Sequence, residues 1–129
     1  MGVFDEWLAR KLKRGGNTLR EHRTVEEEFS RCYGPRSAFA FIVLTGEPCE
    51  TFEYCIEANW PIDAERSERA VLDGILDELL TDYSGYLVTN GRFTLHAIKY
   101  HHVDSSPAAF YQAARAAVKK IVADNVVRP

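Results

Sequence analysis

The chain has 129 residues, of which 46% are hydrophobic and 27% are charged, a composition typical of one soluble globular domain with its own core. Its net charge of −3 does not attract polyanions overall, and no apolar run approaches the roughly 20 residues of a membrane-spanning helix. The N-terminal sequence lacks a secretion-signal pattern, so we expect a soluble cytoplasmic protein with no membrane partner.

Residues 3–14 predict an amphipathic helix with a basic rear face. Gly15 and Gly16 end it. We therefore divide the chain into residues 1–18, a basic helix with a glycine linker, and residues 19–129, the main domain. We expect the apolar stripe to pack on the domain or on a second copy of the chain, because a membrane-surface helix needs a longer apolar face. The stripe consists of Val3, Phe4, Trp7, Leu8 and Leu12.

Positive charge is concentrated in residues 10–23, where six Lys or Arg residues stand against one Glu. This basic patch consists of Arg10, Lys11, Lys13, Arg14, Arg20 and Arg23. Such a cluster contacts phosphate groups of nucleic acids, or it forms an ordinary solvated helix face. The sequence leaves both interpretations open.

Three strands are predicted before the first long helix. Residues 19–30 indicate an exposed strand, and the glycine and proline in residues 32–37 indicate a turn. Residues 38–45 are apolar on both faces, which predicts a central strand. Residues 50–57 alternate cleanly, and we expect them to pair with the central strand as a hairpin across Gly46–Cys49. Their inward side chains would be Phe52, Tyr54 and Ile56.

A helix is predicted from Asp63, as its N-cap, to about Leu80. Gly74 in its middle costs about 1 kcal/mol against alanine, which indicates close backbone packing against a neighbour. Asn90-Gly91 then offers two alternatives. Either it is a hairpin turn between two strands, or it precedes a single strand over residues 92–99 with Phe93, Leu95 and Ala97 on one face.

The last helix begins in the sequence YHHVDSSPAAF, which starts at Tyr100. Ser106 followed by Pro107 is typical of an N-cap and a first helical position. The predicted inner face is rich in alanine, so this helix can lie very close to the sheet. It consists of Phe110, Ala113, Ala114, Ala117, Val118 and Ile121. The element order β-β-β-α-β-α indicates an α+β domain.

Catalysis is not expected from the cluster of His101, Asp104 and Ser105. Neighbours on an extended strand and turn point in different directions, and the sequence has neither a G-x-S-x-G elbow nor a phosphate-binding G-x-x-x-x-G-K-[ST] loop. Asp104, Ser105 and Ser106 are better explained as a structural cap of the following helix. Tyr100, His101 and His102 would then occupy an exposed corner that binds a ligand, or they are ordinary surface residues.

The three cysteines, Cys32, Cys49 and Cys55, contain no CxxC pair. We expect them to be reduced and packed among the strands, because disulfides are disfavoured in the cytoplasm. A zinc site built from them with a histidine is the less favoured alternative. No metal or cofactor is therefore predicted.

The sequence Tyr100-His101-His102-Val103-Asp104-Ser105-Ser106, followed by Ala109-Phe110, resembles the Y-H-x-V-D-S-S-x-x-A-F motif of domain IV of elongation factor G. Residues 34–40 lie where that family has a glycine-arginine tip loop, and the resemblance covers about residues 19–124. It implies a four-stranded sheet covered on one face by two helices, with a left-handed β-α-β crossover. It also implies that Asn90-Gly91 precedes a single strand.

The resemblance further implies a non-enzymatic, stand-alone domain that contacts the small ribosomal subunit or another structured RNA. The expected contacts are Tyr100, His101, His102 and Arg36, assisted by the basic patch. No GTP is expected, because the GTPase domain of the family is not present in this sequence. The second tip loop departs from the family pattern at Pro35, Ser37 and Ala38, which favours an alternative in which the N-terminal helix mediates protein–protein contact or homo-oligomerisation without RNA.

Overall fold

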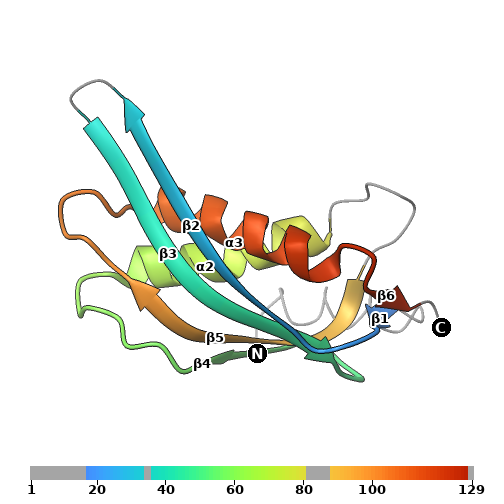
Figure 1. Cartoon of the computed structure of the whole chain (residues 1–129). Helices are drawn as coiled ribbons and strands as arrows, with labels where there is room; N and C mark the ends of the chain where they lie inside the picture. Colours follow the sequence, from blue (N-terminus) through green and yellow to red (C-terminus); the bar gives the residue numbers. More distant parts are fainter. Residues whose placement is uncertain (1–16, 34–35, 81–87, 128–129) are drawn as a thin grey trace.

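The computed structural model describes residues 17–33, 36–80 and 88–127. Figure 1 shows a twisted sheet with two helices lying side by side against it. The elements in chain order are β1 (Asn17–Leu19), β2 (Arg23–Tyr33), β3 (Arg36–Pro48), β4 (Glu53–Ile56), α2 (Glu65–Leu79), β5 (Val88–Lys99), α3 (Pro107–Val122) and β6 (Val126–Val127). The α+β class is therefore as predicted. Within these ranges, neither helix has the length and apolar character that crossing a bilayer requires.

The described part of the sheet has six strands rather than the four that we expected. The additional strands are β1 and β6, which pair with each other, while β1 also pairs with the start of β5. These strands contain three and two residues, too few for a period-2 pattern to show in the sequence. Because β1 starts at Asn17, residues 17 and 18 belong to the sheet and not to a linker. The predicted basic helix lies outside the described residues.

Strand β3 lies between β2 and β5, and it is antiparallel to both. Its central position is as predicted, because its alternate side chains Ala40, Ile42 and Leu44 are fully buried. The predicted hairpin between β3 and β4 is wrong. Strand β4 pairs only with β5, in parallel, so β5 separates the two strands that we expected to be partners.

The connection from β4 through α2 to the parallel strand β5 is a β-α-β crossover. Two parallel strands can be joined only by such a crossover. The turn residues 46–49 instead predicted a local hairpin between β3 and β4. That this crossover is left-handed stays a prediction. Of the three inward residues predicted in this region, Phe52 and Tyr54 pack against the core, but Ile56 is 43% exposed.

Strand β5 runs uninterrupted through Asn90-Gly91, so the single-strand alternative is correct. Its pairing with β3 shifts by one residue, because Leu95 lies opposite Leu44 and Ala97 lies opposite Val43. His96 is therefore the extra residue of a bulge. Phe93 and Leu95 are buried as predicted, but beyond the bulge Ala97 is exposed and Ile98 packs on the core instead.

Helix α2 begins at an N-cap formed by Ala64 rather than by Asp63, and no side chain caps it. Gly74 lies against α3 as predicted: a Cβ atom there would be 2.6 Å from the Tyr111 carbonyl oxygen and 2.8 Å from the Cβ of Ala114. Every residue of the predicted inner face of α3 is buried. The small side chains of this face let the two helices and the sheet share one core.

Candidate functional site

The loop from β5 to α3, residues 100–106, is held by the start of α3. The Ser106 hydroxyl accepts a hydrogen bond from the Ala109 backbone N–H at 3.2 Å, and Pro107 follows it at the start of the helix. Ser106 therefore caps one of the backbone donors that a helix start leaves unpaired. The end of the loop is fixed in direction by this cap.

Asp104 and Ser105 do not bond to the helix, contrary to the role that we expected. The Ser105 hydroxyl donates to the Phe39 carbonyl at 2.8 Å and accepts from the His101 backbone N–H at 2.9 Å. The Asp104 carbonyl accepts from the Phe39 N–H at 3.1 Å, and its carboxylate accepts from the Ser37 hydroxyl at 3.1 Å. Three of these four bonds fasten the loop to β3, and the fourth, from the His101 N–H to Ser105, lies within the loop. The histidine loop and residues 37–40 of the second predicted tip segment therefore lie together at one end of the domain (Figure 1).

The histidine rings lie on the outside of this loop. The His101 ring stacks on Phe39 with the ring centroids 4.0 Å apart and the planes 5° from parallel. His102 meets the Tyr100 ring edge-on at 5.4 Å. Both histidines are exposed, and Val103 beside them is 94% exposed. Tyr100 is different, because its ring stacks on the buried Phe110 and is itself half-buried.

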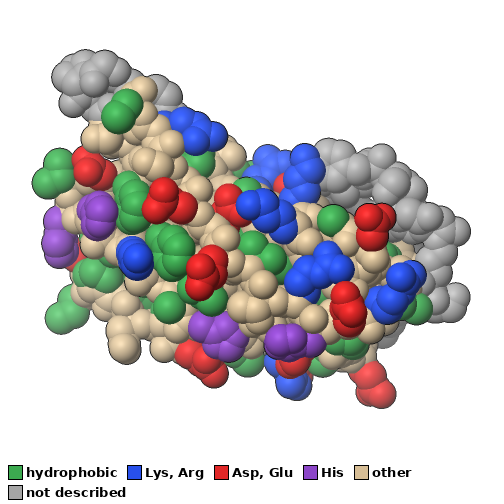
Figure 2. Space-filling view, viewed as in Figure 1, with side chains coloured by type: hydrophobic (Ala, Val, Ile, Leu, Met, Phe, Trp, Pro, Cys, Tyr) green, Lys and Arg blue, Asp and Glu red, His purple; other side chains and the backbone are tan. Residues whose placement is uncertain are grey.

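We call the end of the domain formed by the β5–α3 loop and the adjoining part of the β2–β3 hairpin the tip. Cationic side chains near it include two that the sequence analysis did not select. Arg31 lies over the Phe29 ring at 4.8 Å, and Lys99 lies over the Phe41 ring at 4.8 Å. Arg36 pairs with Tyr33 through the backbone at the hairpin end, but its side chain lies outside what the structure describes. Figure 2 shows histidine side chains at this end of the molecule, with basic and acidic side chains interspersed over the same face.

The basic patch does not join this tip. Arg10, Lys11, Lys13 and Arg14 lie outside the described residues. Arg20 is exposed near the β1–β2 connection. Arg23 lies opposite Gly46, seven positions along β3 from Phe39, which is about 23 Å at the rise of a strand. The described members of the patch therefore lie far from the histidine loop.

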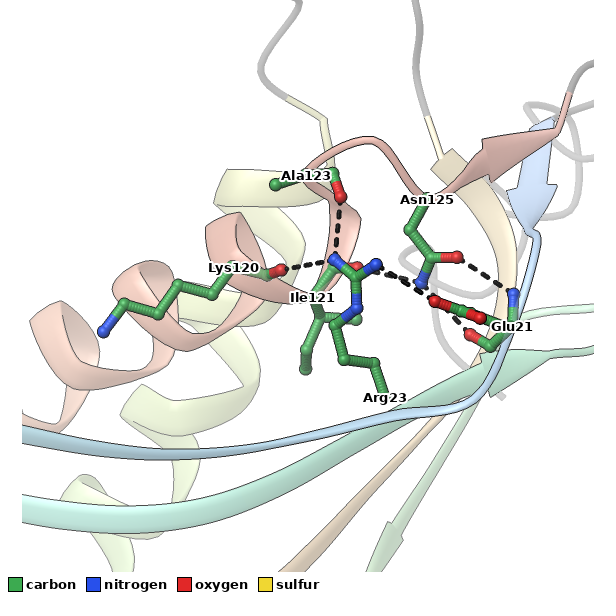
Figure 3. Close-up of polar contacts among 6 residues, drawn as sticks. All are labelled: Glu21, Arg23, Lys120, Ile121, Ala123 and Asn125. Carbon is green, nitrogen blue, oxygen red and sulfur yellow. Dashed lines mark hydrogen bonds and ion pairs between the residues drawn. The ribbon is translucent and has the colours of Figure 1, made fainter.

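Arg23 has a structural role that its sequence context does not reveal. Its guanidinium donates to the carbonyls of Lys120 at 3.0 Å and Ala123 at 2.7 Å, and it also contacts Glu21 (Figure 3). Carbonyls at a helix C-terminus lack intrahelical partners and carry partial negative charge. Arg23 therefore closes the end of α3 opposite to the Ser106 cap.

A second polar cluster lies on the outer face of the sheet, and the sequence analysis missed it. The Thr45 hydroxyl is 2.7 Å from the Thr24 hydroxyl and 2.8 Å from Nε2 of His96, whose Nδ1 is 2.6 Å from a Glu57 carboxylate oxygen. Hydroxyl, imidazole and carboxylate in this order also occur in hydrolases. Thr45, however, is only 4% exposed, and its oxygen is already engaged by Thr24. The cluster therefore holds the bulge in place, and the hydroxyl that contacts the imidazole is buried.

The cysteines are free thiols. Cys32 and Cys55 are exposed, so the prediction that all three pack among the strands is wrong for these two; Cys49 is half-buried. Among the described residues, no group of three or more potential ligands could hold a metal ion.

The fold and the site define an α+β domain in which the β5–α3 loop is fastened to β3 at one end and carries histidines on its outer side. The family model of elongation factor G, domain IV, matches residues 16–125. The chain therefore belongs to the elongation factor G domain IV family.

Among solved structures, a crystal structure of a protein from Thermus thermophilus is similar, with a TM-score of 0.75 and 22% sequence identity. The similarity covers 84% of this chain and 17% of that chain, and at this identity it shows the fold alone. Comparison with curated proteins finds no match.

Proposed function

We propose that this protein binds structured RNA through the tip formed by the β5–α3 loop and the end of the β2–β3 hairpin, and that the small ribosomal subunit is its partner. Family membership supports a function related to translation. The single observation that carries the proposal is the fastening of the histidine loop to β3 by Ser105 and Asp104. This arrangement holds the rings of His101 and His102 outside the core before any ligand arrives.

The chemistry of the tip suits RNA better than DNA duplex or protein. Unstacked bases of RNA loops bind on aromatic and histidine rings, and hydrogen-bond donors contact phosphate and 2′-hydroxyl groups. The His101–Phe39 stack gives a flat platform, and Lys99, which lies over the Phe41 ring two residues along β3, supplies positive charge on the same face of the sheet. Since the loop is already ordered by its bonds to β3, binding costs little conformational entropy.

We further propose that the role is non-enzymatic. In the cluster on the outer face of the sheet the hydroxyl next to the imidazole, that of Thr45, is buried, and the Ser105 hydroxyl at the tip is engaged by Phe39 and His101. Because the Ser105 hydroxyl donates to one backbone group and accepts from another, it is not available as a nucleophile. Binding is what the tip geometry supports.

The test measures co-sedimentation with small ribosomal subunits and the affinity for a fluorescent RNA hairpin at about 50 and 200 mM salt. Loss of one stacking ring costs about 1–3 kcal/mol, so we expect His101→Ala to weaken binding roughly 5- to 150-fold. His22→Ala is the matched control, because His22 is also exposed but lies in the β1–β2 connection, near Arg20 and away from the tip. Thermal unfolding of each variant confirms that the fold is retained.

An equal affinity of wild type and His101→Ala would contradict the site. Wild-type protein that remains wholly in the supernatant at the lower salt concentration would contradict the RNA-binding function itself.

A further inference from the structure

The outer face of the sheet continues the tip along β3. Both described helices lie against the other face (Figure 1), to which the buried alternate residues 40, 42 and 44 belong. Successive side chains of a strand point to opposite faces, so Phe39, Phe41 and Val43 lie on the outer face. They are partly exposed and lie outside the buried core. The outer face therefore carries an apolar row that no described helix covers.

Two rings of this row each have a side chain over one face. The His101 ring lies parallel to Phe39 at 4.0 Å, and the Lys99 ammonium lies 4.8 Å from the centre of the Phe41 ring. Phe39 and Phe41 are two positions apart, which is about 6.6 Å along a strand. This distance is close to that between consecutive phosphates of an extended single strand. Aromatic side chains on the open sheets of RNA-binding domains stack two or three bases, so the row can hold two consecutive unpaired bases.

The charges on the two sides of this row differ. Lys99 lies opposite Phe41 on β5, and Glu28 lies opposite Phe41 on β2. Glu28 is exposed and forms no ion pair with a described residue, whereas Glu27, which points to the other face, pairs with Lys120. A nucleotide has the same asymmetry, because its phosphate is anionic and an amino group on the base edge donates to a carboxylate. A nucleotide lying across β3 therefore has its phosphate beside Lys99 and its base edge beside Glu28.

The acidic side of the row favours a single strand over a duplex. Glu26, opposite Val43, is a second exposed carboxylate on β2. Both backbones of a duplex carry phosphates, so one of them would meet these carboxylates if the duplex lay across the sheet. A single strand places its phosphates along β5, beside Lys99 and His101, and leaves the β2 side to the base edges.

We propose that the outer face of the sheet binds two consecutive unpaired nucleotides of the RNA that the tip contacts. One base stacks on the His101–Phe39 pair, and the next stacks on Phe41. Lys99 moves from the Phe41 ring to the phosphate, because its stem is long and flexible. Glu28 accepts a hydrogen bond from the amino group of the second base. Uracil has a carbonyl oxygen where cytosine has this amino group, so the site prefers cytosine.

This inference rests on the proposed RNA binding, and its test separates the two. The probes are fluorescent oligocytidine and oligouridine of eight nucleotides, which are both single-stranded pyrimidines and differ in the amino group. Their affinities for the full chain are measured by fluorescence anisotropy beside that of the RNA hairpin. Because each oligonucleotide repeats one base, the result does not depend on which nucleotide lies over Phe41.

We expect oligocytidine to bind roughly tenfold more tightly than oligouridine, as the gain of one base-edge contact predicts. Glu28→Gln should abolish this preference, because an amide donates to the uracil oxygen as well as accepting from the cytosine amino group. Glu26→Gln is the matched control and should leave the preference unchanged. It is exposed on the same face of the same strand, but it lies opposite Val43, which has no ring.

Two further variants test the stack and the phosphate contact. Phe41→Leu keeps an apolar side chain but removes the ring, and should weaken both oligonucleotides about 5- to 150-fold. Lys99→Met keeps the stem over Phe41 and should reduce the slope of log affinity against log salt by about one. A purely structural role of either residue would alter thermal unfolding, which is measured for every variant, and would leave the base preference and the salt slope unchanged.

Equal affinities for the two oligonucleotides, or a cytosine preference that survives Glu28→Gln, would overturn the outer-face site. If hairpin binding still depends on His101 in that case, the proposed function stands without it. If neither the hairpin nor either oligonucleotide binds, both proposals fall. Self-association of the chain that Phe41→Leu removes, without oligonucleotide binding, would assign the row to a second copy and also overturn the site.

Discussion

Asn125 lies between α3 and β6, and its side chain links this segment to the end of α3 and to Glu21 in the β1–β2 connection (Figure 3). These contacts lie at the end of the domain opposite to the histidine loop. Asn125 is fully buried. Its amide nitrogen donates to the carbonyls of Glu21 at 3.1 Å and Ile121 at 3.0 Å, and its amide oxygen accepts from the Glu21 N–H at 2.9 Å. Asn125→Asp keeps the acceptor but replaces the donor with an oxygen that faces two carbonyls.

The magnitude follows from these contacts. Two donated bonds are lost, each worth about 0.5–1.5 kcal/mol on its own; because a charge is also left buried without a partner, a total loss of about 3–5 kcal/mol, which includes these bonds, is typical. We therefore expect the free energy of unfolding to fall by about 3–5 kcal/mol at pH 7. Burial raises the pKa of the new carboxyl group, so the folded state holds its proton to a higher pH than the unfolded state.

Stability of the variant relative to wild type must then rise as the pH is lowered from 7 toward the unfolded-state pKa of about 3.9. Urea unfolding at pH 7 and about pH 4.5 measures this, with an unchanged m-value as the check of two-state behaviour. Asn59→Asp is the control, because Asn59 is exposed. A loss below about 1 kcal/mol at pH 7, or a loss independent of pH, would refute the reasoning.

Two further predictions concern the core. Gly74→Ala should destabilise the protein by about 1–3 kcal/mol in urea unfolding, although alanine favours helices by about 1 kcal/mol, because its Cβ would overlap the backbone of α3; a stabilised variant would show that the helices can separate. Tyr54→Phe should stabilise by about 1 kcal/mol, because the Tyr54 hydroxyl is buried and has no partner among the described residues. Burial, with a smaller contribution from Glu68, raises the pKa of Tyr54. The unfolded state therefore loses this proton first, and wild-type stability should fall as the pH rises past about 10 more steeply than that of the variant; parallel alkaline profiles would contradict this.

Local signals in the sequence predicted the features that depend on neighbouring residues. Ser106-Pro107 marked the start of α3, and the glycine at position 74 marked the close approach of the helices, because each acts within one or two turns of a helix. The family motif further resolved Asn90-Gly91, which local turn chemistry alone left open. These elements position the tip, so its location at the junction of β5 and α3 was predictable.

Features that depend on distant pairing were not predictable in this way. The turn residues 46–49 favoured a β3–β4 hairpin, yet β5 lies between these strands because it pairs with both. The bulge at His96 reversed the alternation and turned Ala97 outward. The grouping of Glu28, Phe41 and Lys99 escaped the sequence analysis for the same reason, since these residues come from three strands. No period in the sequence connects these residues.

Helix α3 explains how the tip is positioned independently of its ligand. Its first turn is capped by Ser106, and its last carbonyls are bound by Arg23, while Asn125 ties the segment after it to Glu21. The helix is about 24 Å long, so these anchors lie at opposite ends of the domain. The residues for which we propose RNA contact at one end are thereby separated from residues that stabilise the fold at the other. Substitutions at His101 should therefore change binding with little change in stability, whereas Asn125→Asp should do the reverse as long as the protein stays folded.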